Sequence, residues 1–372
     1  MVPGIAIRQH MAHWAFWDNS TQLSGIPSHE TVLKDTGFTG TKDLFDNGCR
    51  NLLAVLKQQM ADAGYSNTSN WVISTPMPSL AERARLSFLA RNAGIDRIRL
   101  IPSVAAAAVE LCLTYTSLME DMGNGAECDL IVWKDADTIE ICLAAVGNGV
   151  LEYIAYGAKR HVEEKQVAGA IRKIMEEDIL PNIISGLYKQ GTIFINSLPS
   201  DAQNALEHLA ANTGWNSCIE YRGQTDLYGC MRIAGKLSGY DFARDYLPLM
   251  ITEYDYKILK NDQQTIDMIS RNSTIPTRST RPDKDHPGKI RMSDITDRFG
   301  MVTVLLSCPF SSLEYDLIRI PVYEIWNGRN AEEEAQITID IDANLCVDIS
   351  ITNATNNKKL VYSWKEICEQ IS

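Results

Sequence analysis

Two groups of polar side chains in the sequence have the types and the spacing to do chemistry. Arg8, His10 and His13 follow a short apolar run and could form an anion pocket or a histidine pair for a metal ion. Asp135 and Asp137 lie between two apolar runs and could give carboxylate oxygens to a metal, which would need further oxygen ligands. Each group also has a simpler interpretation, as polar residues at strand ends or as an exposed hairpin turn. We favour the simpler interpretations.

The sequence holds none of the common catalytic or metal-binding motifs. The patterns GxSxG, HExxH and GxxxxGK followed by Ser or Thr are absent, and no Cys/His pair has the spacing of a metal site. The nine cysteines are an odd number with no CxxC pair, and most lie within apolar runs. These features predict a cytoplasmic protein with reduced cysteines and without catalytic residues, a metal or a cofactor.

Composition limits the classes of partner. The chain has 372 residues, of which 45% are hydrophobic, so it can bury a large core and should form roughly two or three domains. Its formal net charge of −12 disfavours a nucleic acid or an anionic membrane surface as partner. No apolar run is long enough to cross a bilayer, and the N-terminus lacks a charged leader with an apolar core, so we expect no membrane insertion.

The elements that must position the polar groups are strands that alternate with helices in two successive sets. Between the sets, three apolar runs at residues 130–133, 138–146 and 149–155 are separated by turn-prone residues, which predicts a three-stranded meander. The alternation on either side predicts an α/β core of two similar lobes. Residues 20–43 are rich in Ser, Thr, Gly and Asp and predict a long loop.

The C-terminal part of the chain changes to short β-rich runs, whose spacing predicts a β-sandwich. These runs are residues 265–270, 301–306, 317–322, 336–341 and 346–352. Residues 277–297 are charged and hold Pro282, Pro287 and Gly288, which predicts a mobile loop. Residues 363–370 predict a short C-terminal helix.

Four segments resemble the DnaK-type, seventy-kilodalton heat-shock chaperones. NWVISTPMPSLAERARLSFLARNAGIDRIRLIPSVAAAA at residues 70–108 resembles the family's strand, helix and strand that lead into its NEPTAAA segment. LYGCMRIAGKLSG at 227–239 is similar to AYGAAVQAAILSG, and RNSTIPT at 271–277 is similar to KNTTIPT. ITIDIDANLCVDIS at 337–350 parallels VTFDIDANGILNVS. The segments occur in the family's order and extend over nearly the whole chain.

The resemblance implies a duplicated, ribonuclease-H-like actin fold of two lobes, then a linker and a β-sandwich that grips extended peptides in the family. The implied boundaries are 1–244 for the ATPase-type domain, with lobes 1–125 and 126–244, then 245–252 for the linker, 253–360 for the sandwich and 361–372 for a short helix without a lid. Residues 20–43 and 160–191 are far shorter than the family's equivalent segments. The outer subdomains that clamp adenine would therefore be missing.

The chain departs from the family at the positions that contact nucleotide. Its segments for GIDLGTT, NEPT, DLGGGT and VGGS have lost the metal-coordinating Asp, the acid and most of the glycines. The residues at the family's nucleotide positions are Ala6, Arg8, Gln9, His10, Ser103, Trp133, Asp135, Asp137, Thr138, Asn196 and Ser197. Only Thr138 keeps the family's residue type in the second phosphate loop.

These departures disfavour a bound polyphosphate. Phosphates are cradled by backbone N–H groups that approach closely where glycine has no side chain. Asp135 and Asp137 replace glycines, and one such charge ~4 Å from a phosphate costs ~4 kcal/mol at an effective dielectric constant of ~20. Trp133 fills volume where the family has Asp, and the Mg²⁺ ligands are lost. We therefore expect no ATP hydrolysis and no bound nucleotide.

The function predicted is that of a catalytically inactive, chaperone-like protein that binds a protein partner or an extended peptide, or acts as a scaffold, without nucleotide. One alternative is a structural subunit of a larger assembly, and another is a remodelled nucleotide sensor or ATPase that uses Arg8, His10 and Thr138. Val302 falls where the family has a peptide-pocket residue, and it also fits an ordinary sandwich-core position. In the linker DYLPLMIT, Pro248 interrupts a strand-like run and removes a hydrogen-bond donor, which argues against the family's docking switch.

Overall fold

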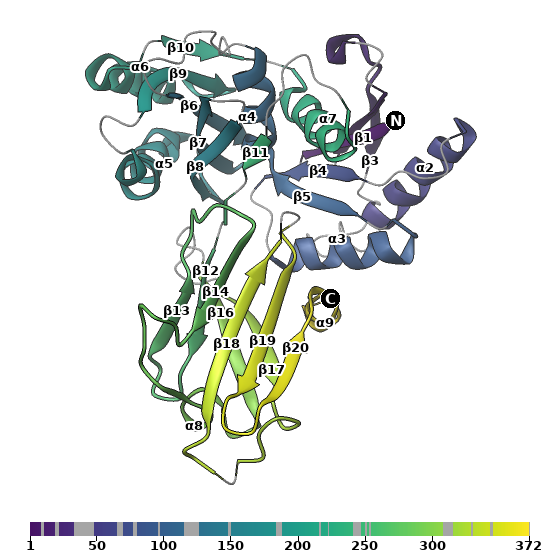
Figure 1. Cartoon of the computed structure of the whole chain (residues 1–372). Helices are drawn as coiled ribbons and strands as arrows, with labels where there is room; N and C mark the ends of the chain where they lie inside the picture. The colour runs from purple at the N-terminus through teal and green to yellow at the C-terminus, as the bar shows by residue number, and fades with distance from the viewer. Residues whose placement is uncertain are drawn as a thin grey trace. The chain divides into compact units, whose positions relative to one another are not determined.

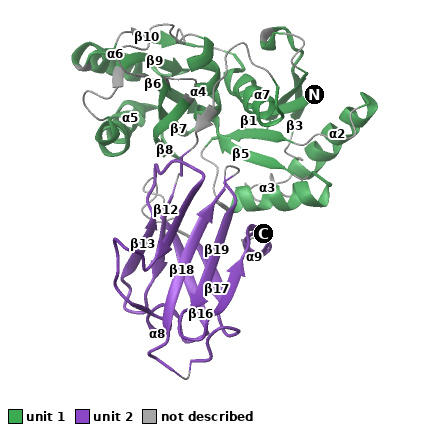
Figure 2. Cartoon of the chain, viewed as in Figure 1, with its two compact units in different colours: residues 1–249 green, residues 250–372 purple. Residues whose placement is uncertain are grey.

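A computed structural model of the chain shows a mixed α/β protein whose described residues form four β-sheets (Figure 1). The residues described are 1–8, 11–18, 22–32, 48–64, 70–76, 80–95, 97–114, 126–147, 150–183, 188–215, 217–221, 223–240, 247–249, 251–252, 254–307, 315–328, 330–342 and 345–371. The chain divides into two compact units, Met1–Leu249 and Met250–Ser372 (Figure 2).

The first sheet of unit 1 has five strands in the order β3-β2-β1-β4-β5. The first three strands pair antiparallel, whereas β4 is parallel to β1 and β5 is parallel to β4. The strands are β1 (Val2–Arg8), β2 (Met11–Trp17), β3 (His29–Val32), β4 (Trp71–Thr75) and β5 (Ile98–Pro102). Nearly every residue of β1 and β4 is buried, which explains why both strands have nearly continuous apolar runs instead of alternating ones.

The predicted meander is present at the centre of the second sheet, where β6, β7 and β8 pair antiparallel in sequence order. The sheet has the order β10-β9-β6-β7-β8-β11, and β9 and β10 are parallel to β6. Its strands are β6 (Ala126–Asp135), β7 (Thr138–Gly147), β8 (Val150–Lys159), β9 (Tyr188–Asn196), β10 (Ser217–Glu220) and β11 (Leu247–Leu249). Apart from β11, the second sheet repeats the strand order and the strand directions of the first.

Helices lie between the two sheets and on their outer faces (Figure 1). Apolar side chains of α2 and α3 share a core with the first sheet, and those of α5 and α6 share one with the second. The helices of unit 1 are α2 (Cys49–Asp62), α3 (Leu80–Asn92), α4 (Ser103–Thr114), α5 (Val167–Ile174), α6 (Ser200–Thr213) and α7 (Thr225–Leu237). Helix α4 follows β5 of the first sheet and packs also against β6 and β7, whereas α7 follows β10 and packs against β1 and β4.

The two inner helices, α4 and α7, meet at a close backbone contact. Gly229 of α7 lies against Ala106 of α4, and a Cβ atom at position 229 would overlap the carbonyl oxygen of Ala106. Beside this contact, Arg232 of α7 donates a hydrogen bond to the carboxylate of Glu110 on α4. Glycine is needed at position 229 because no side chain fits between the two helices there.

The long loop predicted over residues 20–43 is wrong in part, because β3 lies within it. Strand β3 pairs with β2 at the sheet edge, and Trp14 of β2 donates a side-chain hydrogen bond of 2.9 Å to the hydroxyl of Thr31. The sequence of β3 has no apolar alternation because most of its side chains are exposed. Residues 33–43 lie outside the described residues.

The prediction that Pro248 interrupts the linker strand is also wrong. Pro248 is the central residue of β11, which pairs parallel with β8 and places Pro248 opposite Leu151. Proline is tolerated in an edge strand because such a strand pairs on one side only. Residues 247–249 of the predicted linker therefore form the last strand of the second sheet of unit 1.

Unit 2 contains two sheets built from antiparallel pairs, one in the order β13-β12-β16-β17 and the other in the order β14-β18-β19-β20 with β15 also paired to β18. The strands are β12 (Asp255–Leu259), β13 (Thr265–Ile269), β14 (Thr277–Arg281), β15 (Ile290–Arg291), β16 (Met301–Ser307), β17 (Tyr315–Pro321), β18 (Glu334–Ile341), β19 (Val347–Asn353) and β20 (Lys358–Tyr362). Every second residue of β16 is buried, as expected for a strand with one face in the core.

The mobile loop predicted over residues 277–297 is wrong, because this segment forms β14, β15 and the short helix α8 (Met292–Ile295). Strand β14 pairs with β18 along its whole length, and the hydroxyl groups of Thr280 and Thr338 hydrogen-bond at 3.0 Å. Its sequence, TRSTR, contains no apolar residue. Cross-strand hydrogen bonds form this strand without the apolar pattern that identifies strands in a sequence.

The predicted C-terminal helix is present as α9 (Trp364–Ile371), and it covers part of a sheet edge. The side-chain amide of Gln370 accepts a hydrogen bond from the backbone N–H of Arg319 at 3.1 Å and donates one to its carbonyl oxygen at 2.6 Å. Arg319 lies on the edge strand β17. Gln370 thus satisfies a peptide group that a neighbouring strand would otherwise use.

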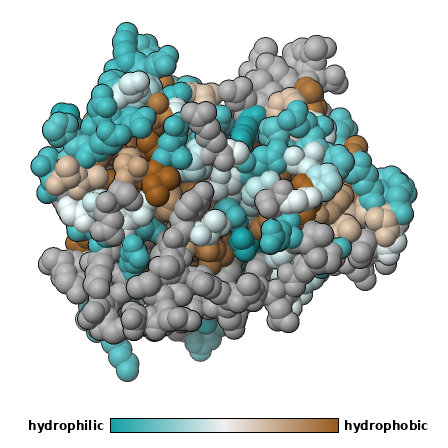
Figure 3. Space-filling view, turned by 90° about the horizontal axis from the view of Figure 1, so that it is seen from above, coloured by the Kyte–Doolittle hydropathy of each residue, from teal (hydrophilic) through white to brown (hydrophobic). Residues whose placement is uncertain are grey.

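The face of the molecule in Figure 3 carries hydrophilic side chains over most of its described surface, with apolar residues in small separate groups. A surface of this kind does not mark an apolar docking patch. In the described part of the chain, every helix is too short or too polar to cross a lipid bilayer.

Candidate functional site

The C-terminal ends of β1 and β6 bring two of the sequence-predicted residues together. The two strands hold the same position in their respective sheets, β1 ending at Arg8 and β6 at Asp135. The Arg8 guanidinium lies over the ring of Trp133 on β6, with its central carbon 5.2 Å from the ring centroid. This distance is within the range of a cation–π interaction.

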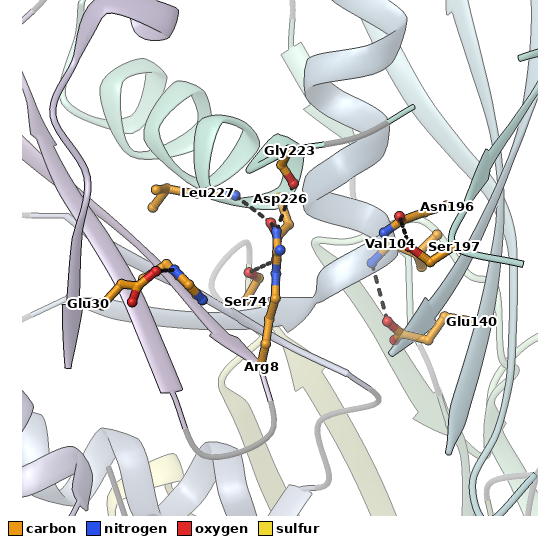
Figure 4. Close-up of polar contacts among 11 residues, drawn as sticks. Arg8, Glu30, Ser74, Val104, Glu140, Asn196, Ser197, Gly223, Asp226 and Leu227 are labelled. Atoms are coloured by element: carbon orange, nitrogen blue, oxygen red, sulfur yellow. Dashed lines mark hydrogen bonds and ion pairs between the residues drawn. The ribbon is translucent and has the colours of Figure 1, made fainter. Parts of the chain in front are cut away.

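Arg8 forms a buried ion pair with Asp226 in the first turn of α7 (Figure 4). Its Nε donates a hydrogen bond of 3.2 Å to Asp226 Oδ2, and its Nη2 donates to Oδ1 and also to the carbonyl oxygen of Gly223 at 3.3 Å. The Asp226 side chain is 0% exposed and that of Arg8 is 24% exposed. One whole edge of the guanidinium is therefore committed to a carboxylate of the same chain.

The remaining bonds of Asp226 come from its surroundings. The backbone N–H of Leu227 donates to Oδ1 at 3.0 Å, and the hydroxyl of Ser74 donates to Oδ2 at 3.5 Å. A carboxylate near a helix N-terminus is favoured by the helix dipole. Asp226 thus completes a set of contacts in which the positive charge of Arg8 is neutralised within the protein.

The ionisation of the neighbouring groups follows from burial and from this pair. Burial alone would lower the pKa of Arg8, but the negative charge of Asp226 raises it overall, so Arg8 stays charged. Burial raises the pKa of Asp135, although Arg8 opposes the effect. Burial and then Asp226 raise the pKa of Tyr221 well above its ordinary value, which keeps its phenol protonated. Arg8 and Tyr221 therefore both keep their protons near neutral pH.

Trp133 fills the space beside the ion pair. Its side chain is 1% exposed, and its ring centroid lies 6.0 Å from that of Tyr221. Within the described residues, neither the indole N–H of Trp133 nor the hydroxyl of Tyr221 has a hydrogen-bond partner. The indole is therefore packed as an apolar side chain.

A second carboxylate lies at the N-terminus of the other inner helix, α4 (Figure 4). Glu140 of β7 is fully buried and accepts hydrogen bonds from the Val104 backbone N–H at 3.3 Å and the Tyr156 hydroxyl at 2.7 Å. Helix N-termini are common anion sites because their backbone N–H groups are unsatisfied. In this chain, side-chain carboxylates lie at the N-termini of both α4 and α7.

No protein-family model matches the chain, and neither does any curated protein sequence. Within the residues that the structure describes, no three His, Cys, Asp or Glu side chains are grouped closely enough to hold a metal ion. The metal hypothesis for Asp135 and Asp137 gains no third ligand from these residues.

Asp137 lies in the two-residue turn between β6 and β7. Ala136 in this turn has a φ of 48°, and the carboxylate of Asp137 pairs with the His161 ring nitrogen at 2.9 Å. Thr138 begins β7, and its hydroxyl lies 3.4 Å from Asp137 Oδ1. This geometry fits the hairpin-turn interpretation.

The structure places the other sequence-predicted residues as follows. Ala6 is fully buried in β1, and Ser103 is buried at the start of α4, where its hydroxyl has no hydrogen-bond partner among the described residues. Asn196 ends β9 and Ser197 follows it, whereas Gln9 and His10 lie outside the described residues. In unit 2, Val302 is 0% exposed in β16. A fully buried side chain offers no surface to a ligand in this conformation.

Sequence reasoning missed Asp226, the partner that defines the site. An acidic residue in the first turn of a helix is common and gives no sign of a buried ion pair. The available signal was Arg8 itself, a charge at the end of a buried apolar strand that needs a counter-ion. Its partner lies 218 residues away, which a single sequence does not reveal.

Proposed function

We propose that the chain is a nucleotide-independent protein-binding or scaffold module, related to the DnaK-type chaperones but without their ATPase. In this proposal, unit 1 is an actin-like core made by duplication, and unit 2 is the β-sandwich that binds peptides. The repeat of one strand order and one set of strand directions in the two sheets of unit 1 supports the duplication. The alternating burial along the strands of unit 2 supports the sandwich.

The observation that carries the proposal is the internal pairing of Arg8 with Asp226 beside Trp133. A polyphosphate would need cations and backbone N–H groups that are free to contact it. Here the Nε–Nη2 edge of Arg8 is already bonded, and Asp226 and Glu140 add negative charge at the two inner helix N-termini. Binding ATP would require breaking a buried ion pair as well as overcoming charge repulsion.

Isothermal titration calorimetry with Mg-ATP and Mg-ADP tests the first half of the proposal. The expected result is no binding heat at millimolar nucleotide and no phosphate release over that of buffer. Micromolar binding would contradict the proposal and support a remodelled nucleotide sensor. An Arg8→Lys variant would then show whether such binding uses this cluster, because lysine keeps the charge without the fork of donors.

Fluorescence anisotropy with extended peptides tests the second half. We expect saturable binding with the same Kd in the presence and absence of Mg-ATP. A Kd that changes with nucleotide would contradict the proposal. Absence of peptide binding, together with self-association that persists at high salt in light scattering, would instead favour a structural subunit of a larger assembly.

A further inference from the structure

Unit 2 contains a pocket of 290 Å³ between the edge of β13 and the end of β14. It is lined by Lys260, Gln264, Thr265, Ile266, Arg281, Pro282, His286, Gly288, Lys289, Ile290 and Asp294. Unlike the cluster around Arg8, this pocket opens to solvent, and two of its basic side chains, His286 and Lys289, are 62% and 76% exposed.

Positive charge predominates in the pocket lining. Lys260, Arg281 and Lys289 line it together with His286, against the single carboxylate of Asp294. The surrounding stretch, residues 257–291, holds eight lysines and arginines and four aspartates, whereas the whole chain has a formal net charge of −12. A basic pocket in an acidic protein favours an anionic ligand group.

Arg281 is the best placed of these residues to hold such a group. Its side chain is 16% exposed, and the hydrogen bonds that it donates within the described residues, to Asp283 and to the carbonyl oxygen of Thr280 at 3.2 Å, both come from the same terminal nitrogen, Nη1. Its Nε and Nη2 are therefore available as a pair of donors. Asp283 also accepts bonds from the backbone and ring nitrogens of His286, at 2.6 and 3.0 Å, so it holds two of the basic residues in place.

A paired fork of two N–H groups matches a carboxylate in geometry as well as in charge. The other basic residues can add to the attraction with less geometric precision. Within the described residues, the ammonium group of Lys260 makes only long contacts, of 3.4 and 3.3 Å, with the side chains of Asp262 and Gln264. Lys289 pairs with Glu334 at an exposed position.

A strand edge borders the same pocket. Thr265 and Ile266 belong to β13, which pairs with β12 and with no other strand in the part of the chain that the structure describes. Its outer edge can pair with an extended peptide, whose alternate side chains would then point to one side of the new strand. Charge and strand edge together specify an extended segment with acidic side chains.

We propose that this pocket binds a glutamate or aspartate carboxylate from an extended segment of a partner protein, with Arg281 as the main contact. The proposal rests on the protein-binding function proposed above and adds the chemical class of the partner. The carboxylate would bond to Nε and Nη2 of Arg281, while the segment pairs with the free edge of β13.

The test uses the full chain and fluorescein-labelled peptides of about ten residues that alternate valine with glutamate, a pattern suited to a strand. A matched peptide carries glutamine in place of glutamate. We expect the glutamate peptide to bind about tenfold or more tightly than the glutamine peptide, because only a carboxylate makes the charge-assisted pair. Equal affinity for the two peptides would overturn the proposal.

Substitutions test whether the peptide binds at this pocket. Arg281→Gln should weaken binding of the glutamate peptide about tenfold. Lys289→Gln should weaken it about threefold, and because Lys289 is exposed this change should have little effect on stability. Arg278→Gln is the matched control, since Arg278 lies on the same strand, is exposed and does not line the pocket. A loss with Arg278→Gln as large as with Arg281→Gln would contradict the assignment to this pocket.

Two further peptides test the alternative ligands, phosphorylated segments and neutral apolar segments. A phosphoserine peptide that binds about tenfold more tightly than the glutamate peptide would assign the pocket to phosphorylated segments and overturn the carboxylate assignment. A neutral apolar peptide distinguishes failure of the pocket assignment from failure of the protein-binding function. If it binds while the acidic peptide does not, the pocket assignment fails and the protein-binding function stands, whereas a Kd that depends on Mg-ATP overturns that function alone.

Discussion

Arg8 in unit 1 and Arg281 in unit 2 are both largely buried arginines, but they use different nitrogens of the guanidinium group for their contacts within the chain. Arg8 gives its Nε and Nη2 to Asp226 and Gly223, whereas Arg281 gives only its Nη1, to Asp283 and Thr280. The edge that best fits a carboxylate or phosphate is consumed inside unit 1 and remains available in unit 2. Which guanidinium nitrogens an arginine uses within its own chain therefore decides whether it can also bind a ligand.

The two ion pairs also differ in how exposed they are to solvent. Asp226 is 0% exposed, so the Arg8 pair is closed to solvent on its acidic side. Asp283 is 30% exposed, and the pocket beside Arg281 is open. Breaking the first pair should cost stability, and breaking the second should cost mainly binding.

The largest effect is expected from Arg8→Ala. Removal of the cation leaves the carboxylate of Asp226 buried without a partner, which should lower the free energy of unfolding by about 3–5 kcal/mol. Urea denaturation followed by circular dichroism measures this loss. The double variant Arg8→Met with Asp226→Leu should recover most of it, and a double variant no more stable than Arg8→Ala would show that the buried charge is not the cause.

Gly229→Ala tests the helix crossing that supports the closed site. The added methyl group meets the backbone of Ala106, which cannot rotate away as a side chain can, so we expect a loss of about 2–3 kcal/mol. Gly169→Ala in α5 is the matched control, because nothing lies near its added Cβ atom. That control should gain about 0.5–1 kcal/mol from better helix propensity, and an equal loss in both variants would contradict the crossing contact.

Gln370→Ala is expected to cost less, because its two hydrogen bonds lie near the surface of unit 2. Losing both should lower the free energy of unfolding by about 1–2 kcal/mol and expose the edge of β17 to other strands. The stability of Gln370→Glu should lie between that of the unmodified chain and that of Gln370→Ala. Glutamate can accept a hydrogen bond from the Arg319 N–H but cannot donate one to its carbonyl oxygen. Denaturation and light scattering at raised temperature measure the two effects, and identical results for both variants would argue against the paired amide.

The smallest effect concerns a half-buried thiol of unit 1. Burial, with a contribution from Glu207, raises the pKa of Cys218 from 9.0 to about 11, so the folded chain holds the thiol proton more tightly than the unfolded chain does. The folded state should therefore lose a little stability as the pH rises from 9.0 to about 11. Iodoacetamide labelling of Cys218, followed by peptide mass mapping, should be slow at pH 8 and accelerate towards pH 11. Labelling at pH 8 as fast as for a small free thiol would contradict the shift.

The sequence predicted the apolar elements well and the polar ones poorly. The meander of β6, β7 and β8 and the helix α9 follow patterns that burial imposes on a sequence, so they could be found from periodicity. Strands β3 and β14 were expected to be loops because they are held at sheet edges by hydrogen bonds and polar side chains. Pro248 was expected to break a strand, but its place at an edge removes the reason for the break.

The residues of the candidate site were likewise identified only in part from the sequence. Resemblance to the family identified Arg8 and Trp133 as unusual residues, and the structure brings them together. Asp226 was not identified because its partner Arg8 lies 218 residues away. The pocket around Arg281 was not identified because residues 277–297 were expected to be a mobile loop, whereas they form β14, β15 and α8. The family membership and the absence of ATPase activity remain predictions. The calorimetry described above can test whether the chain binds nucleotide.

The packing of the two inner helices has a consequence for how unit 1 comes apart. Helix α4 belongs by sequence to the first half but packs against β6 and β7, and α7 belongs to the second half but packs against β1 and β4. Each half therefore contributes one helix to the interior of the other half. Neither should be able to fold when expressed by itself, and heat or urea should melt the pair in a single cooperative step.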